Sequence, residues 1–183
     1  MQKIGIFGGT FAPFHIGHLT IVKCFIEQCE LDKCYIVPNK CSPFKTDVDI
    51  LHSNAKRLEI IEKNIIDIHN MELCLYELNN EVEISYSIDT IKYFREIYTA
   101  ADLFLLIGND VALHFGKWKN YEEILEMVKI VIAARDDKHN EDNNKQLDKI
   151  FGVWGYILLE NPIVDISSTA IRTIKTDNKK CSQ

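Results

Sequence analysis

Residues 4–18 read Ile4-Gly5-Ile6-Phe7-Gly8-Gly9-Thr10-Phe11-Ala12-Pro13-Phe14-His15-Ile16-Gly17-His18. The apolar start predicts a β-strand, the glycine pair a turn, and the residues after it a helix. In such a turn the glycines are expected to take positive φ, and backbone N–H groups with the positive helix end can face a phosphate. His15 and His18 are expected on one face of the first helical turn, where imidazole N–H groups could bond phosphoryl oxygens. The segment therefore predicts a phosphate- or nucleotide-binding site.

Strand-like and helix-like segments alternate along the rest of the chain. The patterns predict strands at 3–7, 34–37, 72–78, 102–107, 129–134 and 156–159. They predict helices at 16–28, 53–68, 120–127 and 167–175, one more from Ser85 or Ser87 to residue 98, and a polar loop or surface helix at 136–148. This order predicts an α/β fold: a Rossmann-like, doubly wound, mostly parallel sheet. We expect one domain over residues 1–175 and a disordered tail over 176–183.

Composition limits the classes of partner. The 183 residues are 46% hydrophobic and 26% charged with a net charge of −6, which is ordinary for one globular domain but unfavourable for a nucleic-acid partner. No apolar run reaches membrane-spanning length, and the N-terminus lacks the layout of a signal peptide. The six cysteines lack metal-site spacing. Because nothing in the sequence suggests secretion, we expect reduced thiols in a cytoplasmic protein that has no membrane partner. The oligomeric state stays open, a homodimer being one option.

A second cluster of anion-binding groups follows the last predicted strand. Ser167, Ser168 and Thr169 come in succession, and Arg172 follows Ser168 by four residues, on the same face of the predicted helix. Any one of these hydroxyls would ordinarily be a helix cap, and the arginine a surface charge. Three hydroxyls in a row after a strand favour an anion-binding nest that Arg172 could reach.

Other candidates lie where parallel sheets bind ligands, beyond the carboxyl ends of the strands. Lys45 occupies a proline-containing loop that could close over a site as a flap. Asp110 follows a buried strand and could hold a ribose hydroxyl, and Trp118 could stack on an aromatic ring. Arg135 comes directly after another buried strand. Each of these residues also has an ordinary structural interpretation, as a solvated charge, a helix cap or a core aromatic.

Two of these segments carry a family resemblance. Residues 8–18 resemble the G-G-T-F-D-P-x-H-x-G-H signature of the nucleotidyltransferase superfamily, and residues 166–172 resemble its I-S-S-T-x-I-R signature. Residues 85–90, Gly108-Asn109-Asp110 and Trp118 make the chain most similar to bacterial nicotinate-nucleotide adenylyltransferases. The resemblance spans roughly residues 4–174.

The resemblance implies adenylyl transfer from ATP to nicotinate mononucleotide in NAD biosynthesis, with pyrophosphate released and Mg²⁺ carried by ATP rather than by a protein metal site. It implies that the catalytic residues are His15, His18, Lys45 and Arg172. It implies that ATP is bound by Gly8, Gly9, Thr10, Phe11, Gly17, Gly108, Asp110, Ile166, Ser167, Ser168 and Thr169. It implies that the acceptor is bound by Ser87, Trp118 and Arg135.

Three positions depart from the family pattern. Ala12 stands where the family usually has Asp, Phe44 replaces a histidine before the loop lysine, and Lys119 follows Trp118 where an aromatic residue is common. Lys119 leaves the acceptor open, with nicotinamide mononucleotide as an alternative. Ala12 leaves open a nucleotide-binding regulatory protein with weak catalysis.

Overall fold

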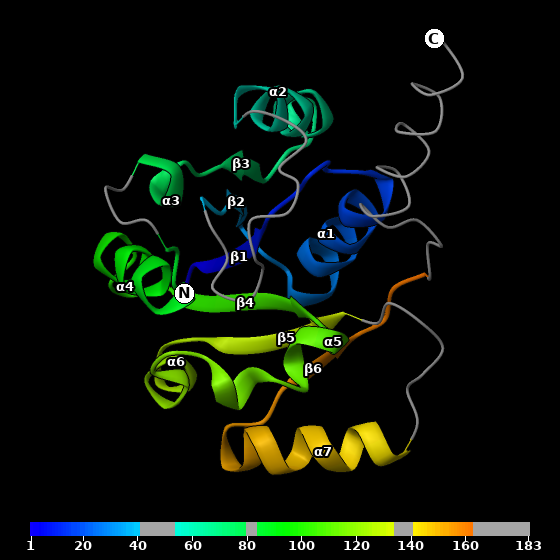
Figure 1. Ribbon diagram of the computed structural model, residues 1–183, viewed down its shortest axis with the longest axis vertical. Coiled ribbons are helices and arrows are strands. Elements are labelled where there is room, and N and C mark those ends of the chain that lie inside the picture. The colour runs from blue at the N-terminus through cyan, green and yellow to red at the C-terminus, as the bar shows by residue number, and fades with distance from the viewer. Residues whose placement is uncertain (41–53, 80–83, 134–140, 163–183) are drawn as a thin grey trace, which may run out of the picture.

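The computed structural model describes residues 1–40, 54–79, 84–133 and 141–162 (Figure 1). In these segments six strands form one parallel sheet in the order β3-β2-β1-β4-β5-β6. The strands are β1 (Lys3–Gly9), β2 (Lys33–Pro38), β3 (Met71–Leu73), β4 (Asp102–Gly108), β5 (Lys129–Ala133) and β6 (Ile157–Leu159). The winding reverses between β1 and β4, and in open α/β sheets this switch point is where ligands bind. The predicted doubly wound parallel sheet is confirmed.

Helices cover both faces of the sheet. They are α1 (Ile16–Cys29), α2 (Asn54–Ile65), α3 (Tyr76–Asn79), α4 (Ser87–Ile97), α5 (Asn109–Ala112), α6 (Tyr121–Met127) and α7 (Glu141–Phe151), with 3₁₀ turns η1 (Phe115–Lys117) and η2 (Gly152–Trp154). Side chains alternate along each strand, so one core forms under α1 and α2 and a second under α4, α6 and α7. Figure 1 shows these two groups of helices on opposite sides of the strands. None of the helices in the described segments has the length and apolarity needed to cross a bilayer.

The prediction of a single strand over 72–78 is wrong. Strand β3 ends at Leu73, and the chain then turns into the short helix α3. Tyr76 of that helix stacks on Tyr93 of α4 with ring centroids 4.2 Å apart, and the Thr90 hydroxyl donates to Glu77 Oε1 at 2.6 Å. Tyr76 and Glu77 both contact α4, whereas in a straight strand these adjacent residues would lie on opposite faces.

The start of α4 confirms one of the two predicted positions, because the helix begins at Ser87. Its N-cap is Tyr86, which makes no side-chain cap hydrogen bond, so neither Ser85 nor Ser87 caps the helix. Instead, Ser85 Oγ accepts a hydrogen bond from the backbone N–H of Lys40 at 3.1 Å. The serine therefore joins the end of β2 to the start of α4.

Gly5 lies in the middle of β1, where α1 approaches the sheet. A Cβ at this position would lie 2.5 Å from Leu31 Cδ1 and 2.8 Å from Phe25 Cε1, and both of these side chains are buried. We therefore expect Gly5→Ala to lower the free energy of unfolding by about 1–3 kcal/mol. Urea denaturation followed by circular dichroism measures this loss. Gly116→Ala is the control, because a Cβ there meets no atom within 4 Å; equal unfolding midpoints for the two variants would contradict the packing argument.

Glu77 makes the free energy of unfolding depend on pH. Burial raises the pKa of its carboxyl group, and the Thr90 hydrogen bond only partly opposes this. The folded state therefore binds this proton more tightly than the unfolded chain, so the contribution to stability is present at low pH and is lost as the pH rises through the raised pKa. In Glu77→Gln the amide oxygen can still accept from Thr90, and we expect a smaller loss of stability between about pH 4 and about pH 8. Denaturant midpoints at the two pH values test this; an unchanged pH dependence would count against it.

Candidate active site

A loop at the carboxyl end of β1 connects this strand to α1. The structure corrects one expectation here: Gly8 and Gly9 are the last residues of β1 and do not have positive φ, which occurs instead at Phe11 (φ 45°). Gly9 matters for another reason, because a Cβ at this position would lie 2.8 Å from Phe11 Cε1. The glycine thus provides the space into which the Phe11 ring folds back.

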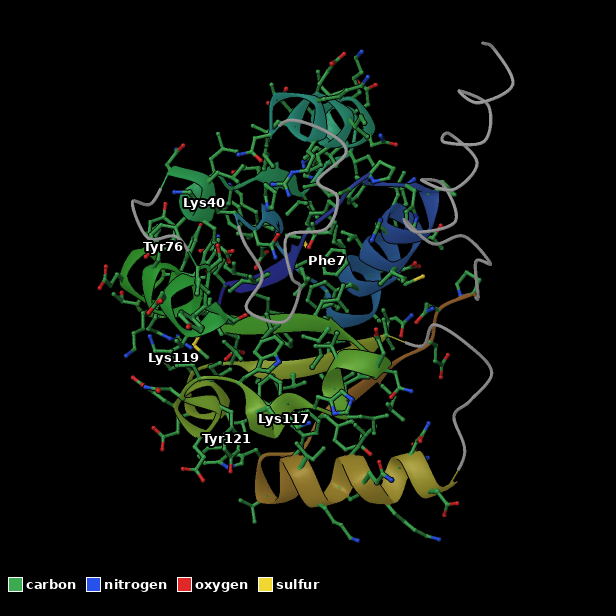
Figure 2. All side chains as sticks on the ribbon, viewed as in Figure 1. Phe7, Lys40, Tyr76, Lys117, Lys119 and Tyr121 are labelled. Carbon is green, nitrogen blue, oxygen red and sulfur yellow. The ribbon has the colours of Figure 1, made fainter. Side chains whose placement is uncertain are left out.

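Aromatic side chains fix the orientation of the His18 ring. Phe11 meets it edge-on with centroids 5.3 Å apart, and Phe14 stacks on it at 5.3 Å with an interplanar angle of 22°. Phe11 in turn packs against Phe7 of β1, which Figure 2 labels, at 5.2 Å. Phe11 and Phe14 are each only 3% exposed. The imidazole is therefore held on an apolar support at the edge of the sheet.

The two histidines predicted to act together lie side by side. His15 is the N-cap of α1 in an extended conformation, and its ring centroid is 3.8 Å from that of His18. The backbone N–H of His15 donates to His18 Nδ1 at 3.2 Å. Because Nδ1 accepts this bond, the proton of the neutral ring resides on Nε2, which becomes an N–H donor. The arrangement suits a group that donates to a phosphoryl oxygen.

A buried arginine supports the same loop and was missed from the sequence. Arg57 of α2 is 0% exposed; its Nη1 donates to the Thr10 carbonyl at 3.0 Å and its Nη2 to the Asn39 carbonyl at 2.7 Å. Asn39 also donates its backbone N–H to the Gly9 carbonyl at 2.9 Å. The available signal was spacing: Arg57 lies four residues before Ile61, on the face of α2 that is otherwise apolar.

The end of β4 contributes the next group. Gly108 ends the strand and is the N-cap of α5, and Asp110 lies exposed in the first turn of that helix. Asn109 is 6% exposed, and no residue of the described segments hydrogen-bonds to its Oδ1. Since β1 and β4 are adjacent and parallel, these residues and the β1 loop occupy the same edge of the sheet. Asn109 is thus an additional candidate that was not in the predicted set.

The predicted acceptor residues belong to two neighbouring elements. Ser87 is the first residue of α4, and Trp118 follows η1, where its ring packs on Phe115 at 4.8 Å. The ammonium group of Lys119 lies 4.3 Å from the centroid of the Tyr86 ring. Tyr86 is the residue that directly precedes Ser87 in the sequence. Figure 2 shows Lys119 between α4 and α6. A positive charge therefore lies beside the positively polarised start of α4.

Part of the predicted site lies outside the described residues. This applies to Lys45 and Arg135, to the preceding Phe44, and to the whole 166–172 segment with Ile166, Ser167, Ser168, Thr169 and Arg172. The predicted helix at 167–175 and the predicted tail lie outside them as well.

Comparisons with known proteins identify the family of this chain. The cytidylyltransferase-like family model matches residues 6–174. Relatives named "Probable nicotinate-nucleotide adenylyltransferase" are 35% identical in Aliarcobacter butzleri, over 94% of this chain and 87% of theirs, and 35% identical in Clostridium novyi, over 94% and 86%. The Plasmodium falciparum nicotinic acid mononucleotide adenylyltransferase complexed with NaAD shares the fold, with a TM-score of 0.73 and 19% identity over 94% of this chain and 83% of that one. The chain therefore belongs to the cytidylyltransferase-like family and, within it, to the nicotinate-nucleotide adenylyltransferases.

Proposed function

We propose that the chain transfers the adenylyl group of ATP to nicotinate mononucleotide, giving nicotinate adenine dinucleotide and pyrophosphate for NAD biosynthesis. One observation carries this proposal: the paired His15 and His18 rings lie at the carboxyl end of β1, beside the switch point of the sheet. A phosphate-binding loop belongs at this point in a doubly wound sheet. The relatives named above are called nicotinate-nucleotide adenylyltransferases, a name that states the acceptor and the transferred group.

The chemistry is an in-line displacement. An oxygen of the acceptor's 5′-phosphate attacks the α-phosphorus of ATP, and pyrophosphate leaves. The attacking phosphate is already ionised near neutral pH, so catalysis comes from positioning and from donors such as His18 Nε2 that stabilise the added charge. Mg²⁺ would arrive on the ATP phosphates.

The remaining roles are assigned from the matching motif positions. His15, His18, Lys45 and Arg172 would contact the ATP phosphates, and Asp110 the ribose. Gly8, Gly9, Thr10 and Gly108 would line the nucleotide site together with the 166–169 segment. Ser87 and Trp118 would lie around the pyridine ring, with Arg135 nearby.

Pyrophosphate release tests the function directly. Mg-ATP is offered with nicotinate mononucleotide, nicotinamide mononucleotide or phosphopantetheine in parallel reactions. We expect turnover with a clear preference for the nicotinate form. A preference for either other acceptor would overturn the assigned substrate but keep the chemistry. ATP binding without turnover on any acceptor would instead indicate a regulatory protein.

Lys119 provides a test of acceptor preference. Its ammonium group and the start of α4 both favour an acceptor that carries a carboxylate, which nicotinate has and nicotinamide lacks. We expect Lys119→Met to reduce the ratio of kcat/KM for the two acceptors by about two- to fivefold, the range for an exposed charge pair. Lys119→Arg should keep the ratio, because it keeps the charge. Lys92→Met is the control for a cation on α4, since Lys92 pairs with Glu123; a ratio unchanged in Lys119→Met would exclude a role for this charge.

We propose a cytoplasmic location on the state of the cysteines. The four cysteines of the described segments are free thiols, namely Cys24, Cys29, Cys34 and Cys74. Burial raises the pKa of the Cys29 thiol, which keeps it protonated and unreactive. Such thiols suit a reducing compartment.

A further inference from the structure

The side chain of Arg57 is a buried cation that pairs with no anion among the described residues. It is 0% exposed, and its partners among the described residues are the carbonyl oxygens of Thr10 and Asn39. No residue of the described segments bonds its Nε, and burial lowers the pKa of the guanidinium. Charged side chains are rarely buried unless they are paired, so a carboxylate partner would be the ordinary arrangement. Burying this charge costs free energy, and the charge lies directly beneath the β1 loop.

The two carbonyls that Arg57 binds belong to the ends of adjacent strands. Thr10 follows β1, Asn39 follows β2, and the Asn39 N–H also bonds the Gly9 carbonyl. A guanidinium is planar and presents its donors in a rigid fork, so it can hold two carbonyls at a fixed separation. A lysine ammonium has no such fork. Arg57 therefore fixes the exit of the loop from β1 relative to the end of β2.

The geometry of the peptide bond fixes the direction of the N–H group that follows each of these two carbonyls. In a trans peptide the C=O and the following N–H point in opposite directions. The Asn39 carbonyl points to Arg57, and the next N–H, that of Lys40, points away and donates to Ser85 Oγ. By the same rule the Thr10 carbonyl turns the N–H of Phe11 away from Arg57. Among the described residues none accepts a hydrogen bond from this N–H.

We propose that Arg57 is a positioning residue for ATP: it holds the Thr10 carbonyl so that the Phe11 N–H faces the phosphates, and it adds positive charge behind them. The inference rests on the proposed binding of ATP at the β1 loop. Backbone N–H groups that are oriented in advance stabilise phosphoryl charge without a reorganisation cost. A guanidinium whose partners in the described segments are two neutral carbonyls favours an anion at the same place. Arg57 itself touches neither substrate in this assignment.

Three variants test the proposal. Arg57→Met keeps much of the side-chain volume but removes the charge and the donors, whereas Arg57→Lys keeps the charge without the fork. Lys63→Met is the matched control, because it removes an exposed cation, paired with Glu59, from the same helix. For each variant, kcat and KM are measured separately for ATP and for nicotinate mononucleotide and scaled to the folded fraction from circular dichroism.

We expect Arg57→Met to lower kcat/KM for ATP by about tenfold or more, because the loop donors are misplaced, while the KM for the acceptor stays unchanged. Arg57→Lys should recover only part of this loss, and Lys63→Met should behave like the parent protein. A kcat/KM for ATP that matches the parent, or equal changes in KM for both substrates, would overturn the proposal. If Arg57→Met does not fold, Arg57→Lys carries the same test.

Hydrogen exchange separates this inference from the proposed function. In the nucleotide-free protein, amides over residues 9–14 are expected to exchange faster in Arg57→Lys than in the parent or in Lys63→Met. Unchanged exchange would overturn the positioning role whatever the activity. Faster exchange in a protein whose parent form releases no pyrophosphate with any acceptor would support the loop constraint and contradict the adenylyltransferase assignment.

Discussion

Replacing His18 by alanine is expected to lower turnover by about two to three orders of magnitude while the fold is kept, as for the loss of one oxyanion-stabilising donor. The reason lies in the hydrogen bond from the His15 N–H to His18 Nδ1, which leaves the ring proton on Nε2. Phe11 and Phe14 hold this ring in place, so the donor costs little to orient when charge develops on the phosphorus.

Two amide variants separate the donor from the helix cap. In His18→Asn the amide oxygen comes near the position of Nδ1 and can still accept from the His15 N–H, but no group reaches the position of Nε2. His18→Gln places an N–H₂ donor near the Nε2 position. We therefore expect low turnover for Asn and a partial recovery for Gln, measured as kcat with both substrates saturating. His69→Ala, at an exposed histidine, is the control. An Asn variant as active as the Gln variant would mean that His18 acts only as a cap.

The sheet could be predicted because its signals are local. The apolar core of β4, residues 103–107, is buried almost throughout, as a continuous apolar run predicts, and α1 begins at Ile16 as its helical spacing predicts. The prediction of one strand at 72–78 was wrong because the alternating residues of this segment belong to two different elements, β3 and α3. What turns the chain after Leu73 is packing of Tyr76 and Glu77 on α4, and the pattern of segment 72–78 itself does not reveal those partners.

The site could be predicted in part, for the same physical reason. His15 and His18 are three residues apart in a helix start, so their proximity follows from helix geometry. Arg57 could not be placed in this way, because its role depends on two carbonyls that are distant in the sequence. The glycine pair was predicted as a turn with positive φ after the strand, but both residues lie in β1 and neither has positive φ. At Gly9 the requirement for glycine comes from the Phe11 ring, whereas a Cβ at Gly8 would meet only the Val37 carbonyl oxygen, at 3.9 Å.

This interpretation of Gly9 leads to the second large effect. We expect Gly9→Ala to lower turnover by about 10- to 100-fold with only a modest loss of stability. The new methyl group would lie 2.8 Å from Phe11 Cε1 and 2.9 Å from Cζ. The ring is packed against Phe14 at 5.4 Å and against His18 at 5.3 Å, so it cannot retreat without moving the His18 imidazole.

The control for Gly9→Ala is the same substitution four residues earlier. Gly5→Ala also overpacks β1, but against Leu31 and Phe25 in the core under α1, so it should lose stability and keep its turnover per folded molecule. The double variant Gly9→Ala/Phe11→Leu removes the ring that the methyl group meets and should regain part of the lost kcat. Equal turnover in Gly9→Ala and Gly5→Ala, scaled to folded protein, would show that the Phe11 ring does not transmit the displacement to His18. A recovered double variant would show that it does, because only relief of this contact connects the two substitutions.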